Sequence, residues 1–192
     1  MPIRAVIMAL RGAACVAALA GMGTPTLAVE PARPTGRVEA EYAITWMGIT
    51  VYSARLGATW EGGRYRMHFR AEAQGLVRLA ANTVIAWETR GRFVKGRLHP
   101  ETFEQANTFR KQTRRISIAY AAPNGPSAPP TVSVVPPESP GKRPPVPDGL
   151  KANTLDPLTA TFAAVAMPLS TKACGYTAKV FEGLRRTDVR LE

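Results

Sequence analysis

Apolar and polar side chains alternate residue by residue between Arg64 and Ala71. The apolar positions are Tyr65, Met67, Phe69 and Ala71, and the polar positions between them are Arg64, Arg66, His68 and Arg70. A period of two is typical of a β-strand with one buried and one solvated face. The same alternation occurs in residues 38–46 and 52–60, and Glu61–Gly63 predicts a hairpin turn. Because each run is apolar on a single side, the pattern favours an antiparallel sheet.

Weaker strand patterns follow along the chain. Strands are predicted at residues 83–89, 93–95, 101–109, 111–120, 179–181 and 187–191. Arg90–Arg92 is predicted as a turn, and Gly96–Pro100, which includes His99, as a further break. Residues 75–82 are ambiguous and compatible with a short helical turn.

Composition changes sharply at Ala121. Ten of the 17 prolines lie between Pro123 and Pro147, which predicts a Pro-rich loop insertion over residues 121–152, with a short edge strand within 132–135.

The clearest helix follows this insertion. Asp156 is predicted as its N-cap and Pro157 as its first residue, and the scarcity of charge predicts that it is buried. The expected fold is therefore mainly β: a curved, half-barrel-like antiparallel sheet that wraps one buried helix near residues 157–167. Residues 37–192 form a single β-rich domain in this interpretation.

The first 28 residues are typical of a secretory signal peptide. Arg4 and Arg11 supply positive charge, Gly12–Met22 an apolar run, and Thr26–Ala28 small residues for cleavage. Translation from Met8 is an alternative start, and an uncleaved anchor and a lipoprotein carrying lipid on Cys15 are the competing interpretations. Cleavage leaves a linker over 29–36 and no further segment of membrane-spanning length. The sequence thus predicts a periplasmic protein.

Charge indicates the kind of partner. The formal net charge is +11, and removal of the two leader arginines leaves an excess of nine positive charges. Outside the cytoplasm the available polyanions are lipid headgroups, lipopolysaccharide and cell-wall polymers, so nucleic acid is disfavoured. Only Cys174 remains after cleavage; it is buried, pairs between chains, or lacks its partner in this chain.

Several segments resemble an exported bacterial family, domain of unknown function family 3108. The resemblance spans residues 41–192 and is most specific at Asp156-Pro157-Leu158-Thr159-Ala160 and at Val180–Arg186; it also includes Tyr42–Ile44, Gly48-Ile49 and Gly96–Phe103. Thr159 and Glu182 replace the family's more usual Ser and Asp. The resemblance implies a periplasmic β-rich domain with no assigned activity. It also implies further strands and a later cysteine in other members, hence the hypothesis that this chain is C-terminally truncated.

No residue pattern predicts chemistry. His68 and His99 have no His or Cys neighbours in the sequence, no Ser lies in a nucleophile elbow, and no carboxylates pair at a useful spacing. Asp156 is interpreted as a helix cap rather than a catalytic acid. We therefore expect no enzymatic activity, no cofactor and no metal.

Two functions remain. The first is a binding module for a lipophilic or acylated ligand, such as a lipid or a lipoprotein, with a candidate apolar pocket of Tyr42, Trp46, Tyr52, Trp60, Phe69 and Trp87. The alternative is a structural or interaction protein of the cell envelope that contacts anionic polymers or lipid headgroups. Its candidate anion-binding residues are Arg110, Lys111, Arg114 and Arg115. A solvated outer face is the simpler explanation of such basic clusters.

Overall fold

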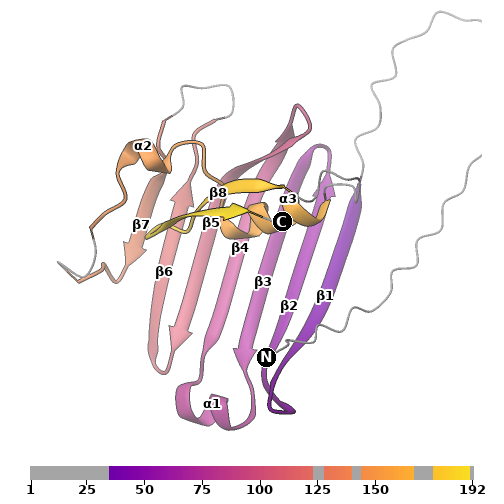
Figure 1. Cartoon of the computed structure of the whole chain (residues 1–192), viewed down its shortest axis with the longest axis vertical. Coiled ribbons are helices and arrows are strands. Elements are labelled where there is room, and N and C mark those ends of the chain that lie inside the picture. The colour runs from indigo at the N-terminus through magenta and orange to yellow at the C-terminus, as the bar shows by residue number, and fades with distance from the viewer. Residues whose placement is uncertain (1–34, 123–127, 140–143, 167–174, 191–192) are drawn as a thin grey trace, which may run out of the picture. The chain divides into compact units, whose positions relative to one another are not determined.

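The computed structural model describes residues 35–122, 128–139, 144–166 and 175–190 (Figure 1). The elements in chain order are β1 (Gly36–Trp46), β2 (Ile49–Glu61), β3 (Arg64–Ala73), α1 (Gly75–Ala81), β4 (Val84–Val94), β5 (Arg97–Phe109), β6 (Gln112–Ala119), β7 (Thr131–Val135), α2 (Asp148–Lys151), α3 (Pro157–Ala166), β8 (Thr177–Phe181) and β9 (Arg186–Arg190).

Strands β1 to β7 form one antiparallel sheet in which chain order equals spatial order. The sheet is open, and the predicted mainly β fold class is confirmed. Glycines 62 and 63 close the β2–β3 hairpin with positive φ angles of 58° and 78°, a conformation that glycine adopts without steric cost.

The predicted turn at Arg90–Arg92 is wrong. Strand β4 continues through it to Val94, with only a register shift between Arg90 and Gly91. Gly91 is needed for close packing, because a Cβ there would meet the backbone oxygen of His99 and the Tyr65 ring. The predicted break at Gly96–Pro100 is wrong as well: the turn is at Lys95 and Gly96, and β5 already begins at Arg97.

One face of the sheet, called here the inner face, carries the core. Its buried residues are Ala58, Tyr65, Met67, Phe103, Ile116 and Ile118, and Leu158 of α3 and Phe181 of β8 pack against them. Figure 1 shows α3 and the separate β8–β9 hairpin lying across this face. Leu158, Thr159 and Ala160 are buried, whereas Val165 in the last turn is 74% exposed. The burial predicted for the helix therefore applies to its first turn.

The Pro-rich insertion contributes two elements. β7 pairs with β6 as the sheet's edge strand, where the sequence predicted one, and α2 adds a short helix that it did not predict. The proposed signal peptide and most of the proposed linker lie outside the described residues, as does Cys174. The longest described helix, α3, has 10 residues, and none of the helices in the described ranges has the length and apolarity that crossing a bilayer requires.

Candidate functional site

Part of the inner face lies outside the contacts of α3. That helix contacts β3, β4, β5 and β8. Toward α1, the core ends at a row of residues paired across neighbouring strands, which includes Phe69 of β3 and Trp87 of β4. The next row toward α1 runs across the sheet as Tyr42, Ala54, Ala71, Ile85, Asn107 and Arg114. Tyr42 is 49% exposed, and Ile44 beyond it is 48% exposed. We call the surface formed by Tyr42, Ile44, Tyr52, Phe69, Ile85 and Trp87 the open face.

The structure brings four of the six predicted aromatic residues to this open face. The rings of Phe69 and Trp87 lie 5.5 Å apart on neighbouring strands, and Tyr42 and Tyr52 lie on β1 and β2 beside them. Trp87 Nε1 donates a hydrogen bond of 3.0 Å to Asn107 Oδ1, which fixes the orientation of its ring.

The other two aromatic residues lie elsewhere. Trp60 packs 5.7 Å from the ring of Phe162 on α3 and belongs to the covered half. Trp46 lies at the end of β1, beyond a register shift, and is 67% exposed. The six side chains therefore do not line one pocket.

The four residues of the predicted basic cluster do not lie on one surface, because successive side chains of β6 point to opposite faces of the sheet. Arg110 and Lys111 occupy the β5–β6 turn, Arg114 shares the inner face with its partner Asn107, and Arg115 is on the outer face opposite Ala106. The Arg110 guanidinium lies 5.5 Å from the centre of the Phe109 ring. Within the described part of the chain, none of the four has an ion-pair partner.

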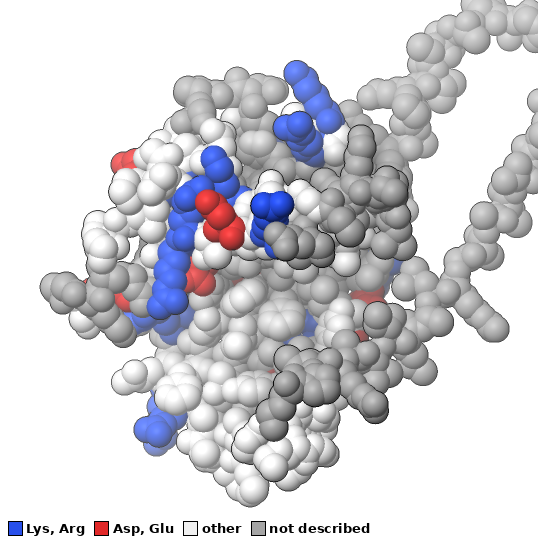
Figure 2. Space-filling model, viewed as in Figure 1, with Lys and Arg blue, Asp and Glu red and all other residues white. Residues whose placement is uncertain are grey.

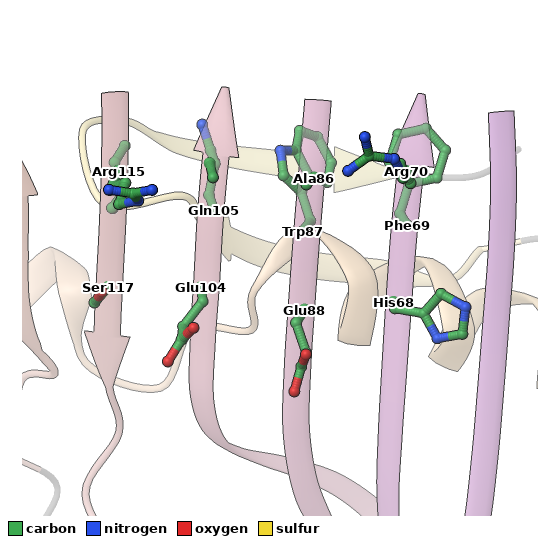
Figure 3. A pocket seen from close by; sticks show the side chains of 12 residues that line it. His68, Phe69, Arg70, Ala86, Trp87, Glu88, Glu104, Gln105, Arg115 and Ser117 are labelled. Carbon is green, nitrogen blue, oxygen red and sulfur yellow. The ribbon is translucent and has the colours of Figure 1, made fainter. Parts of the chain in front are cut away.

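A hollow of about 350 Å³ on the outer face brings two carboxylates together (Figure 3). Glu88 of β4 and Glu104 of β5 are directly opposed in the sheet register. Figure 3 shows His68 turned away from them, and its ring lies over Gly57. The sequence alone does not reveal this carboxylate pair, because the pair depends on the β4–β5 register.

The hollow does not contain a catalytic arrangement among the residues that the structure describes. Partial burial acts to raise the pKa of Glu88, but hydrogen bonds from Arg66 and Arg90 outweigh burial and hold that pKa below its ordinary value. A carboxylate that stays ionised between two guanidinium groups is a poor general acid. Ser117 is opposite Glu104, but His68 does not approach it. No three His, Cys, Asp or Glu side chains within these ranges gather as metal ligands.

The other histidine singled out in the sequence makes a local backbone contact. His99, which was expected in a turn, lies within β5 opposite Arg92. Its Nδ1 is 2.9 Å from the backbone oxygen of Pro100.

A comparison with known protein families shows to which family the chain belongs. The family described as "Protein of unknown function (DUF3108)" matches residues 41–192. The chain belongs to this family. No curated protein and no solved structure matches it.

The first of the two segments most specific to the DUF3108 resemblance surrounds Asp156, which is fully buried. Its Oδ1 accepts a hydrogen bond of 2.9 Å from the backbone N–H of Thr159, the geometry of an N-cap. Its Oδ2 accepts from the hydroxyl of Thr159 at 2.6 Å and from that of Thr89 at 2.9 Å. Burial raises the pKa of Asp156, and these hydrogen bonds oppose the rise. The carboxylate therefore links α3 to the sheet and has no access to a ligand in solution.

The second segment holds the β8–β9 hairpin against the same core. Phe181 is fully buried, and its backbone N–H donates to Leu155, the residue before Asp156, at 2.9 Å. A Cβ at Gly183 would meet Ile116 on β6. The two segments on which the sequence resemblance is most specific thus join the helix and the β8–β9 hairpin to the sheet, and the open face lies apart from them.

Proposed function

We propose that this DUF3108 domain is a binding module for a lipophilic or acylated ligand, held on the open face. The observation that carries the proposal is the exposure of Tyr42 and Ile44, about half of each side chain, on the same face as the packed pair Phe69 and Trp87. Large apolar side chains exposed beside a packed aromatic pair are a typical feature of a surface that binds a ligand or partner.

The row that crosses the open face suggests which ligand fits. It begins with the half-exposed phenol of Tyr42, continues over Ala54 and Ala71, which are themselves buried, and over the half-buried Ile85, and ends with Asn107 and Arg114. An extended acyl chain complements the apolar positions. The guanidinium of Arg114, which has no ion-pair partner among the described side chains, complements an anionic head. The ligand class proposed is therefore a single-chain anionic amphiphile, either free or as the acyl part of a lipoprotein.

Palmitate binding to the purified full chain tests this proposal. Ile44→Glu places a charge on the open face and is expected to abolish saturable displacement of a fluorescent fatty acid by palmitate. Val189→Glu is the matched control, because Val189 of β9 is, like Ile44, a partly exposed β-branched residue of a strand, at 37%, and is not part of the open face. Absence of saturable palmitate binding, or equal binding by Ile44→Glu and wild type, would overturn it.

A second ligand separates the roles of the apolar chain and the anionic head. Arg114→Gln is expected to weaken binding of palmitate and to leave binding of hexadecanol unchanged, because the alcohol has no negative charge. Equal weakening for both ligands would contradict the role assigned to Arg114.

The alternative is an envelope protein that contacts anionic polymers or lipid headgroups through its basic residues. It is favoured by the absence of acid partners for Arg110, Lys111 and Arg115 among the described side chains. Binding to lipopolysaccharide or cell-wall sacculi that weakens steeply with salt would support this function. Both functions suit the periplasmic location that the N-terminal sequence predicts, which we retain as part of the proposal.

A further inference from the structure

We propose that one end of the sheet docks on an anionic lipid bilayer. This end, called here the α1 end, consists of the β1–β2 turn, the β3–β4 connection with α1, and the β5–β6 turn: residues 45–50, 74–83 and 109–113. An antiparallel meander places every second connection at the same end of the sheet. The proposal rests on the alternative function above, for which it specifies the surface and the partner, and does not depend on ligand binding by the open face.

Hydrogen bonds join these three segments into one surface. The backbone N–H of Gln74, which precedes α1, donates to Val51 of β2 at 2.9 Å, and Gln74 Nε2 donates to Ser53 Oγ at 2.8 Å. At the other end of α1, the backbone N–H of Arg110 donates to Ala81 at 2.6 Å. The helix is therefore fixed to the strands on both sides and presents its side chains as part of a continuous end surface.

The α1 end exposes large apolar side chains. Helix α1 has no buried residue, and its Leu76 and Leu79 are 76% and 84% exposed. The neighbouring turns add exposed side chains of four more residues: Trp46, Met47, Ile49 and Phe109. Both leucines of α1 are exposed to water on the outer side of the helix. Insertion of this side into a bilayer would bury them in an apolar environment.

Charge at this end has a single sign. The three segments contain Arg78, Arg110 and Lys111 and no Asp or Glu, and in Figure 2 the lowest part of the molecule is white and blue without red. None of these three cations is in an ion pair with a described residue, whereas five arginines of the outer face pair with glutamates: Arg55, Arg66, Arg70, Arg90 and Arg92.

The combination distinguishes an anionic membrane from a second copy of the chain. Two copies joined through this end would bring two uncompensated positive surfaces together. Exposed side chains of Trp, Phe and Leu can enter a membrane interface, while neighbouring Arg and Lys side chains contact the negative headgroups.

Vesicle co-sedimentation of the full chain tests the proposal. Vesicles of equal parts phosphatidylcholine and phosphatidylglycerol are expected to bind the protein, with binding that weakens as salt is raised, and pure phosphatidylcholine vesicles much less. Residues 1–34 are common to wild type and all variants, so their contribution cancels when variants are compared.

Two pairs of variants locate the contact. Arg110→Gln with Lys111→Gln is expected to weaken binding to the anionic vesicles roughly 30-fold, since each basic residue at such a surface contributes about fivefold. The matched control is Lys95→Gln with Arg97→Gln, in the β4–β5 turn and at the first residue of β5, at the opposite end of the sheet. Lys95 and Arg110 share a positive φ, of 49° and 56°. Leu79→Asp is expected to abolish binding, and Val165→Asp on α3, at a similarly exposed site, to leave it unchanged.

Three results would overturn the proposal. They are equal binding of neutral and anionic vesicles, equal loss in both double variants, and a wild-type dimer in solution that Leu79→Asp converts to a monomer. The last result would assign the α1 end to self-association. Circular dichroism melting of each variant verifies that the fold is intact, and fatty-acid binding by the open face is measured separately without vesicles.

Discussion

Thr89, in the middle of β4, donates a hydrogen bond of 2.9 Å to the carboxylate of Asp156, 67 residues later in the chain. Both side chains are fully buried. The hydroxyl of Thr159 donates its proton to the same carboxylate. The hydroxyl of Tyr65, 3.1 Å away, therefore acts as the donor to the Thr159 oxygen. This chain of polar groups connects β3, β4 and α3 within the core.

Asp156→Ala is expected to lower the free energy of unfolding by about 3 kcal/mol, because it removes an N-cap and leaves buried hydroxyls without an acceptor. The measurement is urea unfolding followed by circular dichroism. Asp148→Ala is the control: this aspartate lies in the first turn of α2, but its side chain is 73% exposed. The control is expected to cost less than about 0.5 kcal/mol. Equal losses would contradict the role of the buried network.

The pH dependence of stability provides a second test of Asp156. Burial raises the pKa of Asp156 above its ordinary value of 3.8, so the folded state holds this proton at pH values where the unfolded chain has released it. The stability that the group contributes is fully present below the unfolded pKa and is lost as pH rises through the folded pKa. Asp156→Asn does not titrate. The unfolding free energy of wild type minus that of Asp156→Asn is therefore expected to fall as pH rises from about 4, and a constant difference would exclude a raised pKa.

Gly91 illustrates where sequence reasoning succeeded and failed. The period-two runs identified β1, β2 and β3, and the Asp156-Pro157 pair identified the start of α3, because each of these signals is local. The predicted turn at Arg90–Arg92 failed because a glycine flanked by arginines has the composition of a turn. Its actual requirement, space for Tyr65 and the His99 backbone, depends on neighbouring strands that the local sequence does not reveal.

The same error concealed the carboxylate pair of the outer face. With the turn placed at Lys95 and Gly96, as the structure has it, Glu88 and Glu104 become partners once the register shift is included. The open face was equally beyond the sequence, because alternation shows which side of a strand is apolar but not which part of that side α3 covers.

Substitution of Gly91 tests the packing explanation. Gly91→Ala is expected to destabilise the fold by about 2 kcal/mol, because the added methyl group meets backbone and an aromatic ring rather than a flexible side chain. Gly149→Ala in α2 is the matched control: a Cβ there meets nothing within 4 Å and the backbone has no positive φ. It is expected to be neutral or slightly stabilising, since alanine favours a helix over glycine. Thermal melting measures the stability of both variants. Equal stability of Gly91→Ala and wild type would contradict the packing explanation.

The two opposed glutamates of the outer face are expected to respond oppositely to neutralisation. Arg66 and Arg90 are direct partners across β3 and β4, and Glu88 lies between them, with Oε1 3.0 Å from the Arg66 guanidinium and 2.7 Å from that of Arg90. Glu88→Gln leaves these two cations in repulsion and is expected to cost about 1 kcal/mol at low salt, a cost that added salt reduces.

Glu104→Gln is the matched variant, because it neutralises the facing carboxylate, which has no ion-pair partner among the described side chains. Removing its repulsion with Glu88 is expected to leave stability unchanged or to raise it by a few tenths of a kcal/mol. Urea unfolding of both variants at low and high salt measures the difference. Equal destabilisation by the two variants would mean that the carboxylates act through packing or strand propensity rather than through the arginines beside Glu88.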